Sequence, residues 1–411
     1  MRAQEDPKTV SEPTVRDAPT VRESIEAGSP ALFTPITLRG VTLRNRIVIS
    51  PMQQYAAGHD GLPTDYHIAH YGRLAMGGAG LVLTEALCTS PQGRLTYADL
   101  GVWDDDFIPP LARVATNMRE MGAVPGAQIL HGGRKSSVQR PWQGFEPLTA
   151  ADIQERGEVP WETIGPSALA ANDGWPVPRE MTQADIDIAL ADYAAAARRC
   201  REAGFDALDV HGAHGYLIHA FLSPISNQRT DGYGGDLEGR MRFALEVAEA
   251  VRSEWPEDKP LFYRISCIDD EPGGWTLDES IVLAAELGLR GVDVIDCSSR
   301  GLGLRGTPVV TPREQGFQVP FAERIKQDTD LVTMAVGLIM NPAYAETVVA
   351  DGRADLVAIG REALNNPNWP LHAANTLMGD DAYDSVWHPR TGWWLSKRAK
   401  SLAAAKQMSR T

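Results

Sequence analysis

The chain of 411 residues contains only four cysteines, and no two of them stand in a Cys-x-x-Cys spacing. This scatter argues against a disulfide framework and against a cysteine-ligated metal or iron–sulfur cluster. No run of about 18 apolar residues occurs, so no segment is predicted to span a membrane. Positive charge is also scarce, because 39 Lys and Arg face 54 Asp and Glu and give a net charge of −15, which disfavours nucleic acid and anionic membranes as partners. The four cysteines are Cys88, Cys200, Cys267 and Cys297. Together these absences predict a soluble, cytoplasmic protein.

Residues 1–30 are polar, rich in Pro, Glu and Thr, and lack apolar periodicity, so we expect a disordered N-terminal extension. Ordered structure is predicted to begin near Leu32. Eight short apolar runs then alternate with helical patterns, and apolar residues on both faces of a run are typical of parallel strands covered by helices. The runs are residues 46–50, 80–85, 125–130, 207–210, 261–266, 292–297, 331–336 and 354–360.

The clearest helical pattern covers residues 182–203, where Thr182 and Asp185 form an N-terminal cap and Gly204 ends the helix. Residues 240–252 and 278–287 have similar patterns. Eight strand-then-helix units favour an α/β fold of the (β/α)8 TIM barrel class over residues 31–378. A doubly wound sheet would need a glycine-rich phosphate loop after the first strand, and Ser-Pro-Met-Gln-Gln-Tyr is not one.

Two long insertions, residues 131–181 and 298–319, interrupt this alternation and are predicted to be active-site loops over the carboxyl ends of the strands. The tail, residues 379–411, concentrates three tryptophans and several basic residues between positions 386 and 398. An aromatic segment of this kind is typical of one that docks on another surface.

The candidate site begins where the strand at 207–210 delivers His211 at its carboxyl end, and Gly212 and Gly215 permit a sharp turn there. On a continuing strand His211 and His214 would face opposite sides, whereas past a turn they can converge with Tyr216. Two core or helix-capping histidines are the structural alternative. The polar run at 227–235 that follows favours a functional site.

Phosphate sites of these barrels favour the loops after strands seven and eight. Here these loops contain Val336-Gly337 and Gly360-Arg361, where glycine backbone and a guanidinium suit a phosphate. The alternative is that Gly360 only turns the chain and Arg361 pairs with a surface carboxylate. Arg264, within a predicted strand, requires an anion, which is either a bound ligand or an ion pair with Asp296 or Glu85.

Residues 211–243 read His-Gly-Ala-His-Gly-Tyr-Leu, then Phe-Leu-Ser-Pro, then Asn-Gln-Arg-Thr-Asp-Gly-Tyr-Gly-Gly. This segment resembles the signature of the old yellow enzyme family of FMN-dependent ene-reductases, and most closely its bacterial thermophilic-like and xenobiotic reductase subgroup. The resemblance covers residues 31–377. It implies FMN as cofactor, NADPH or NADH as hydride donor, and a ping-pong reduction of activated C=C bonds in α,β-unsaturated carbonyl or nitro compounds, without a metal.

The resemblance also implies roles for individual residues. His211 and His214 would hold the substrate oxygen, Tyr216 would donate the proton, and Tyr55 would contact the substrate. The positions implied for FMN binding are Ser50, Pro51, Met52, Gln53, Ala86, Gln128, Arg264, Val336, Gly337, Gly360 and Arg361.

The sequence departs from the subgroup at Gln53, where a cysteine is usual, and at Gly239, which replaces the asparagine of Glu-Asn-Arg. Members of the subgroup form homo-oligomers, dimers or tetramers, and often borrow an arginine or tryptophan from a neighbour's C-terminus; Arg390, Trp393 and Trp394 are the candidates here. The alternative function is a flavin-binding redox carrier or sensor without ene-reductase turnover. Relatives that carry an iron–sulfur cluster are disfavoured by the cysteine pattern, and a Schiff-base aldolase by the absence of lysine from the predicted strands.

Overall fold

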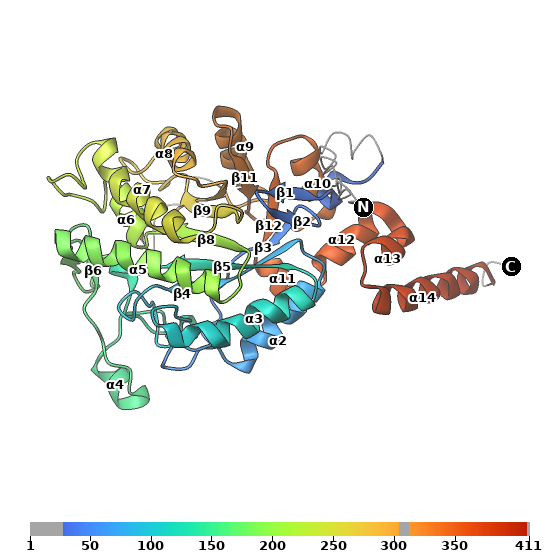
Figure 1. Ribbon diagram of the computed structural model, residues 1–411, viewed down its shortest axis with the longest axis horizontal. Coiled ribbons are helices and arrows are strands. Elements are labelled where there is room, and N and C mark those ends of the chain that lie inside the picture. Colours follow the sequence, from blue (N-terminus) through green and yellow to red (C-terminus); the bar gives the residue numbers. More distant parts are fainter. Residues whose placement is uncertain (1–27, 304–311, 409–411) are drawn as a thin grey trace, which may run out of the picture.

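The computed structural model describes residues 28–303 and 312–408, and all eight predicted strands are present in it. They pair in parallel and form one closed barrel in the order β10-β11-β12-β3-β4-β5-β8-β9 (Figure 1). The predicted TIM barrel is therefore confirmed. The strands are β3 (Ile47–Ile49), β4 (Leu81–Cys88), β5 (Val124–Leu130), β8 (Ala207–Gly212), β9 (Leu261–Ser266), β10 (Val294–Ser298), β11 (Val332–Ala335) and β12 (Leu356–Ile359).

Eight helices cover the outside of the barrel. The longest, α5, begins after Thr182, whose hydroxyl accepts the N–H of Asp185, and Gly204 (φ 83°) follows its end, as predicted. Helices α7 and α8 start earlier than predicted because Asp236 and Thr276 cap them. The helices are α2 (Asp65–Met76), α3 (Ile108–Glu120), α5 (Gln183–Glu202), α7 (Leu237–Glu254), α8 (Leu277–Leu289), α9 (Val319–Asp328), α10 (Pro342–Ala350) and α12 (Trp369–Met378).

The barrel interior is apolar towards the amino ends of its strands. Val48, Phe262 and Met334 belong to one buried cluster there, together with Leu38 and Leu43 of a hairpin that the sequence did not predict. This hairpin, β1 (Ile36–Leu38) and β2 (Val41–Leu43), closes the amino end of the barrel. Polar groups inside the barrel are consequently left to the carboxyl end, where enzymes of this fold have their active sites.

The first insertion, between β5 and α5, contains no long helix, as expected. It consists of the turns η3 (Gly133–Lys135) and η4 (Pro141–Gln143), helix α4 (Ala150–Arg156) and the short strands β6 (Ile164–Gly165) and β7 (Arg179–Glu180). The predicted disordered extension and the middle of the second insertion lie largely outside the described residues. Short elements elsewhere are η1 (Ala31–Phe33), η2 (Asp105–Phe107), α6 (Leu217–Leu222), α11 (Arg361–Asn365), η5 (Gly379–Asp381) and α13 (Ala382–Ser385).

The chain ends in helix α14 (Pro389–Met408), which projects away from the barrel (Figure 1). Trp393 and Trp394 on this helix are 54% and 68% exposed, so they are not docked on the described part of their own chain. The four cysteines are buried and unpaired. In residues 28–303 and 312–408, no helix is both long and apolar enough to cross a membrane.

Candidate active site

Strand β8 places His211 at the carboxyl end of the barrel, and the chain turns there because His214 (φ 59°) and Gly215 (φ 73°) both have left-handed backbone. The turn brings the two imidazoles together, with His214 Nδ1 at 3.1 Å from His211 Nε2. His211 Nδ1 accepts the N–H of Ala213 at 3.2 Å, so the neutral ring carries its proton on Nε2. Burial, helped by the charge of Arg264, lowers the pKa of both histidines well below the usual value. Both rings are therefore neutral at pH 7.

One phenol, Tyr216, faces this histidine pair, and a second, Tyr55, lies near Tyr216. The ring of Tyr216 lies 5.0 Å from that of His211, at an angle of 74° between the planes. Tyr55 (φ 54°) packs edge-on against Trp142 of the first insertion, with 5.7 Å between ring centroids. Burial raises the pKa of both phenols above the usual value, and the proximity of Tyr216 contributes to the rise at Tyr55. Both side chains thus keep their protons at neutral pH.

The loop after β3 is tied to β4 through Gln53. The register of β4 shifts between Leu83 and Ala86, and the N–H of Ala86 donates to Gln53 Oε1 at 2.7 Å. The other end of this amide, Nε2, is buried and has no hydrogen-bond partner among the described residues. Because buried polar groups are nearly always hydrogen-bonded, this donor indicates a ligand at the mouth of the barrel.

Buried polar and charged side chains of β5, β8, β9 and β10 lie inside the barrel near the histidines. Gln128 Nε2 donates to Asp209 Oδ2 at 2.7 Å, and Arg264 Nε lies 3.3 Å from Asp296 Oδ2. The ion pair with Asp296 that was an alternative for Arg264 is therefore present. Arg264 Nη1 also reaches Ser50 Oγ at 3.3 Å, so the same guanidinium faces the loop after β3. Burial raises the pKa of both aspartates, and the charge of Asp296 adds to the rise at Asp209.

The loops after β11 and β12 close the ring of strand ends. Gly337 has a φ of 122°, and a Cβ placed on Gly360 would find only Met52 Sδ, at 4.0 Å, so the space over this backbone is open. Arg361 is exposed, and within the described residues no carboxylate forms an ion pair with it. The surface ion pair considered for Arg361 is thus not observed among the described residues. Ser50, Pro51, Met52 and Val336 lie at the same end of the barrel, after β3 and β11.

The structure also places several side chains at the site that were not predicted from the sequence. Ser266 Oγ accepts the N–H of His214 at 2.9 Å, and Ser298 Oγ lies 2.7 Å from His214 Nε2. Lys135 Nζ donates to the carbonyl of His214 at 2.7 Å and lies 5.6 Å from the centre of the Tyr216 ring. Ser266 ends a predicted strand and Ser298 directly follows one, and this position was the signal that could have identified them. Among the described residues, no cluster of His, Cys, Asp and Glu could hold a metal ion.

Residues 31–379 match the NADH:flavin oxidoreductase / NADH oxidase family. The chain is 44% identical over 347 residues to the NADPH dehydrogenase of Geobacillus thermodenitrificans (strain NG80-2), an alignment that covers 84% of this chain and 94% of that protein. The structure of morphinone reductase in complex with tetrahydroNAD is similar at a TM-score of 0.69 and 26% identity, over 84% of this chain and 91% of that one. An old yellow enzyme homologue from Zymomonas mobilis has a TM-score of 0.66 and 25% identity, over 82% and 91% of the chains.

FMN, the cofactor of this family, is compatible with the residues at the barrel mouth. The unpartnered amide of Gln53, the open backbone at Gly360 and the exposed guanidinium of Arg361 offer donors to a planar polar ring and a phosphate. The match over residues 31–379 and the 44% identity to an NADPH dehydrogenase establish the family. The chain therefore belongs to the NADH:flavin oxidoreductase / NADH oxidase family, as an NAD(P)H-dependent FMN oxidoreductase of the old yellow enzyme type.

Proposed function

We propose that the protein is an ene-reductase, which uses NADPH or NADH to reduce the activated C=C bond of α,β-unsaturated carbonyl or nitro compounds by a ping-pong mechanism. The observation that carries this proposal is the meeting of two neutral imidazoles and a protonated phenol at the carboxyl end of the barrel, with His214 Nδ1 3.1 Å from His211 Nε2. A protein that only stores or senses electrons would not require all three groups.

FMN, when bound, supplies the hydride chemistry, since it takes a hydride from the nicotinamide and delivers it to the substrate. Arg264 would hold the part of the flavin that gains negative charge on reduction. Gln53, Ala86 and Gln128 would bind the ring edge, together with the 50–52 segment, while Val336, Gly337, Gly360 and Arg361 would hold the phosphate. Ala86, Gln128 and Arg264 lie within barrel strands. The other residues lie in the loops that follow β3, β11 and β12 at the carboxyl end of the barrel.

His211 and His214 would bind the oxygen of the substrate. The Nε2–H of His211 faces His214, and an incoming oxygen can accept this hydrogen bond instead. Neutral imidazoles that donate to this oxygen would stabilise the enolate-like charge that develops there, as the donors of an oxyanion hole do. Tyr55, held against Trp142, would contact the remainder of the substrate.

Tyr216 would then complete the reduction. Its O–H bond breaks as a C–H bond forms at the α-carbon, and the negative charge passes from the enolate to the phenol oxygen until solvent returns a proton. Burial raises the pKa of Tyr216, which keeps the phenol protonated before the step.

An anaerobic visible spectrum tests this function. The band of the bound flavin should bleach when NADPH is added and return when 2-cyclohexenone follows. A band that bleaches but never returns would favour the redox carrier or sensor over the ene-reductase. A matched sample of the His211→Ala/His214→Ala variant should still bleach with NADPH. It should be reoxidised far more slowly by the enone, because the substrate oxygen loses both donors.

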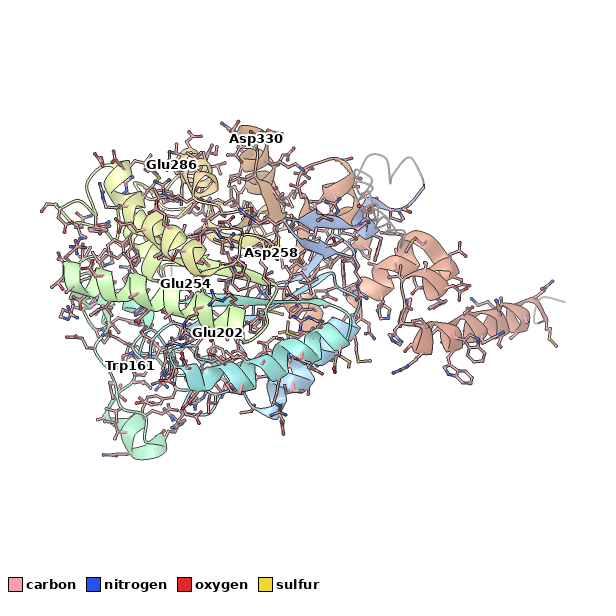
Figure 2. The ribbon with its side chains drawn as sticks, in the orientation of Figure 1. Trp161, Glu202, Glu254, Asp258, Glu286 and Asp330 are labelled. Carbon is pink, nitrogen blue, oxygen red and sulfur yellow. The ribbon has the colours of Figure 1, made fainter. Side chains whose placement is uncertain are left out.

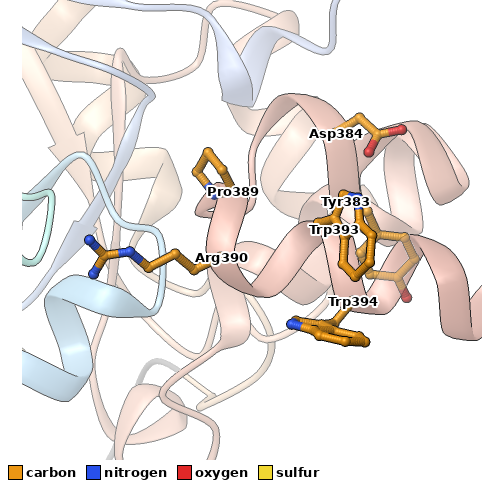
Figure 3. Close-up of a pocket in the computed structure, with 6 residues that line it drawn as sticks. All are labelled: Tyr383, Asp384, Pro389, Arg390, Trp393 and Trp394. Carbon is orange, nitrogen blue, oxygen red and sulfur yellow. The ribbon is translucent and has the colours of Figure 1, made fainter.

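We also propose that the protein is a homo-oligomer in which α14 docks on a second copy of the chain. Arg390, Lys397, Arg398, Lys400, Lys406 and Arg410 give residues 389–411 six positive charges and no acidic residue. Because the whole chain carries −15, the residues before this segment carry −21, and exposed acidic side chains such as Asp258 and Asp330 lie on the outside of the barrel (Figure 2). A basic helix with two exposed tryptophans is complementary to such a surface. Trp393 and Trp394 of this helix and Tyr383 of α13 line one side of a pocket, while Arg390 extends to the other side (Figure 3).

Removal of residues 389–411 should therefore convert the oligomer to monomers, measured by sedimentation equilibrium at low salt. The Trp393→Gln/Trp394→Gln variant should weaken the assembly without removing its charge. An unchanged mass in both variants would contradict the docking of α14, and binding of the full chain to anionic vesicles without self-association would identify a membrane surface as the partner.

A further inference from the structure

The peptide group between His214 and Gly215 is held at both of its ends. Its carbonyl, on His214, accepts a hydrogen bond from Lys135 Nζ at 2.7 Å. Its N–H, on Gly215, donates to His219 Nδ1 at 2.8 Å. The peptide lies between the histidine that binds the substrate oxygen and the proton donor Tyr216, so its orientation sets the direction in which the chain leaves His214.

This peptide needs such support because its conformation is unfavourable. His214 is a non-glycine residue with a φ of 59°, and Gly215 at 73° has no room for a side chain, since a Cβ there would lie 2.4 Å from the carbonyl oxygen of Gly301. A left-handed non-glycine residue persists only where its surroundings fix it, and such residues cluster at functional sites.

His219 is itself oriented by a buried carboxylate. Its Nε2 lies 2.9 Å from Asp269 Oδ1, and both side chains are inaccessible to solvent. Asp269 Oδ2 accepts the hydroxyl of Ser223 at 2.6 Å and the N–H of Trp275 at 2.7 Å. Because Nδ1 accepts the N–H of Gly215, the neutral ring carries its proton on Nε2, the nitrogen that lies beside the carboxylate. The network thus fixes both the position and the tautomer of the imidazole.

Lys135, which lies in the loop after β5, holds the carbonyl end of the 214–215 peptide. Its side chain is 2% exposed, and its amino group also donates to the carbonyl of Gly301. Among the described residues, no carboxylate forms an ion pair with it. Lysine is seldom buried without a charged partner, so a site that buries it on backbone carbonyls uses it to hold those carbonyls in place.

We propose that Lys135 and His219, the latter oriented by Asp269, are positioning residues that lock the 214–215 peptide and thereby aim Tyr216 at the substrate. The three residues are called the peptide clamp below. This inference rests on the proposed function, because it assumes that Tyr216 delivers the proton. None of the three touches the substrate; they act through the backbone on the direction of the phenol.

The experiment compares His219→Leu and Lys135→Met with the conservative variants His219→Asn, which keeps an acceptor near the Nδ1 position, and Lys135→Arg, which keeps the donors. All are loaded with FMN and studied by anaerobic stopped flow, each with and without Tyr216→Phe. Loss of the clamp should slow reoxidation by 2-cyclohexenone at least ~10-fold, since displacement of a catalytic group by about 1 Å costs up to ~100-fold. Bleaching by NADPH and the affinity for a phenolate ligand should change less than about threefold. The conservative variants should recover most of the rate.

The decisive readout is the coupling with Tyr216. In the Tyr216→Phe background the clamp variants should slow reoxidation less than about twofold further, because residues that act through one group are not additive. Lys259→Met is the matched control. Lys259 Nζ also donates to a carbonyl, that of Phe205 at 2.7 Å, and lies 5.7 Å from the Trp255 ring, but it precedes β9 at the amino end of the barrel. This control should leave both half-reactions unchanged.

The clamp is refuted if its variants reoxidise at the wild-type rate or slow both half-reactions equally. It is also refuted if their fold-change in the reoxidation rate multiplies in full with that of Tyr216→Phe. His219 and Lys135 hold opposite ends of the peptide, so either variant alone tests the proposal if the other does not fold. Failure of the proposed function would be distinct, since 2-cyclohexenone would then not reoxidise the wild-type protein, and failure of the role of Tyr216 would leave reoxidation unchanged in Tyr216→Phe alone.

Discussion

Replacement of Tyr216 by phenylalanine is expected to slow reoxidation of the reduced protein by 2-cyclohexenone ~100-fold or more, which is the usual contribution of a general acid. The ring would stay beside His211, where the two centroids are 5.0 Å apart, and only the transferable proton would be lost. Bleaching by NADPH requires no proton from Tyr216 and should remain within about twofold of the wild-type rate. Anaerobic stopped-flow measurements separate the two steps.

Tyr263→Phe is the matched control for this prediction. It also deletes one buried phenol hydroxyl, but that hydroxyl donates to the carbonyl of Ala244 at 3.0 Å, between β9 and α7 and away from the barrel mouth. Both half-reactions should be unchanged in this variant. Equal slowing of bleaching and reoxidation in Tyr216→Phe would remove Tyr216 from the role of proton donor.

Replacement of Arg264 by leucine is expected to have the largest effect on stability and on FMN affinity. Arg264 is the cation that faces the buried carboxylate of Asp296, and removal of one member of a buried ion pair costs roughly 3–5 kcal/mol. Urea unfolding of the FMN-free protein measures this loss. Flavin fluorescence measures the affinity separately, and we expect FMN to bind at least ~10-fold more weakly because a charge-assisted contact is lost.

The pH dependence of this variant follows from the two aspartates. Burial raises the pKa of Asp209 and Asp296 in the folded state, so the folded protein binds protons that the unfolded chain releases. Without the guanidinium both values rise further. The stability of Arg264→Leu is therefore retained near pH 4 and lost as pH rises through the folded pKa values, so its deficit should be larger at pH 8 than at pH 5.

The Arg264→Leu/Asp296→Asn variant serves as the control. It removes the unpaired carboxylate and should recover a substantial part of the stability without recovering the affinity for FMN. Wild-type stability and wild-type FMN affinity in Arg264→Leu would together contradict both roles assigned to this arginine.

The order of strands and helices could be predicted because each barrel strand is a short apolar run, buried on both faces. The ends of strands were less predictable. The first strand forms ladder pairs only at Ile47–Ile49, and β10 begins at Val294 rather than at residue 292, because Gly291 and Val292 still hydrogen-bond to the end of α8. Hairpin β1–β2 was missed because each of its strands has three residues, too few to show a periodicity.

The sequence by itself determined the barrel and the candidate residues at its mouth, since hydrophobic pattern and strand position are local properties of the chain. The approach of His211 to His214, the choice of Asp296 as partner of Arg264 and the support of the 214–215 peptide by Lys135 and His219 were decided only by the tertiary structure. These contacts join side chains from different strand ends and loops, and closure of the barrel is what brings those ends within hydrogen-bond distance.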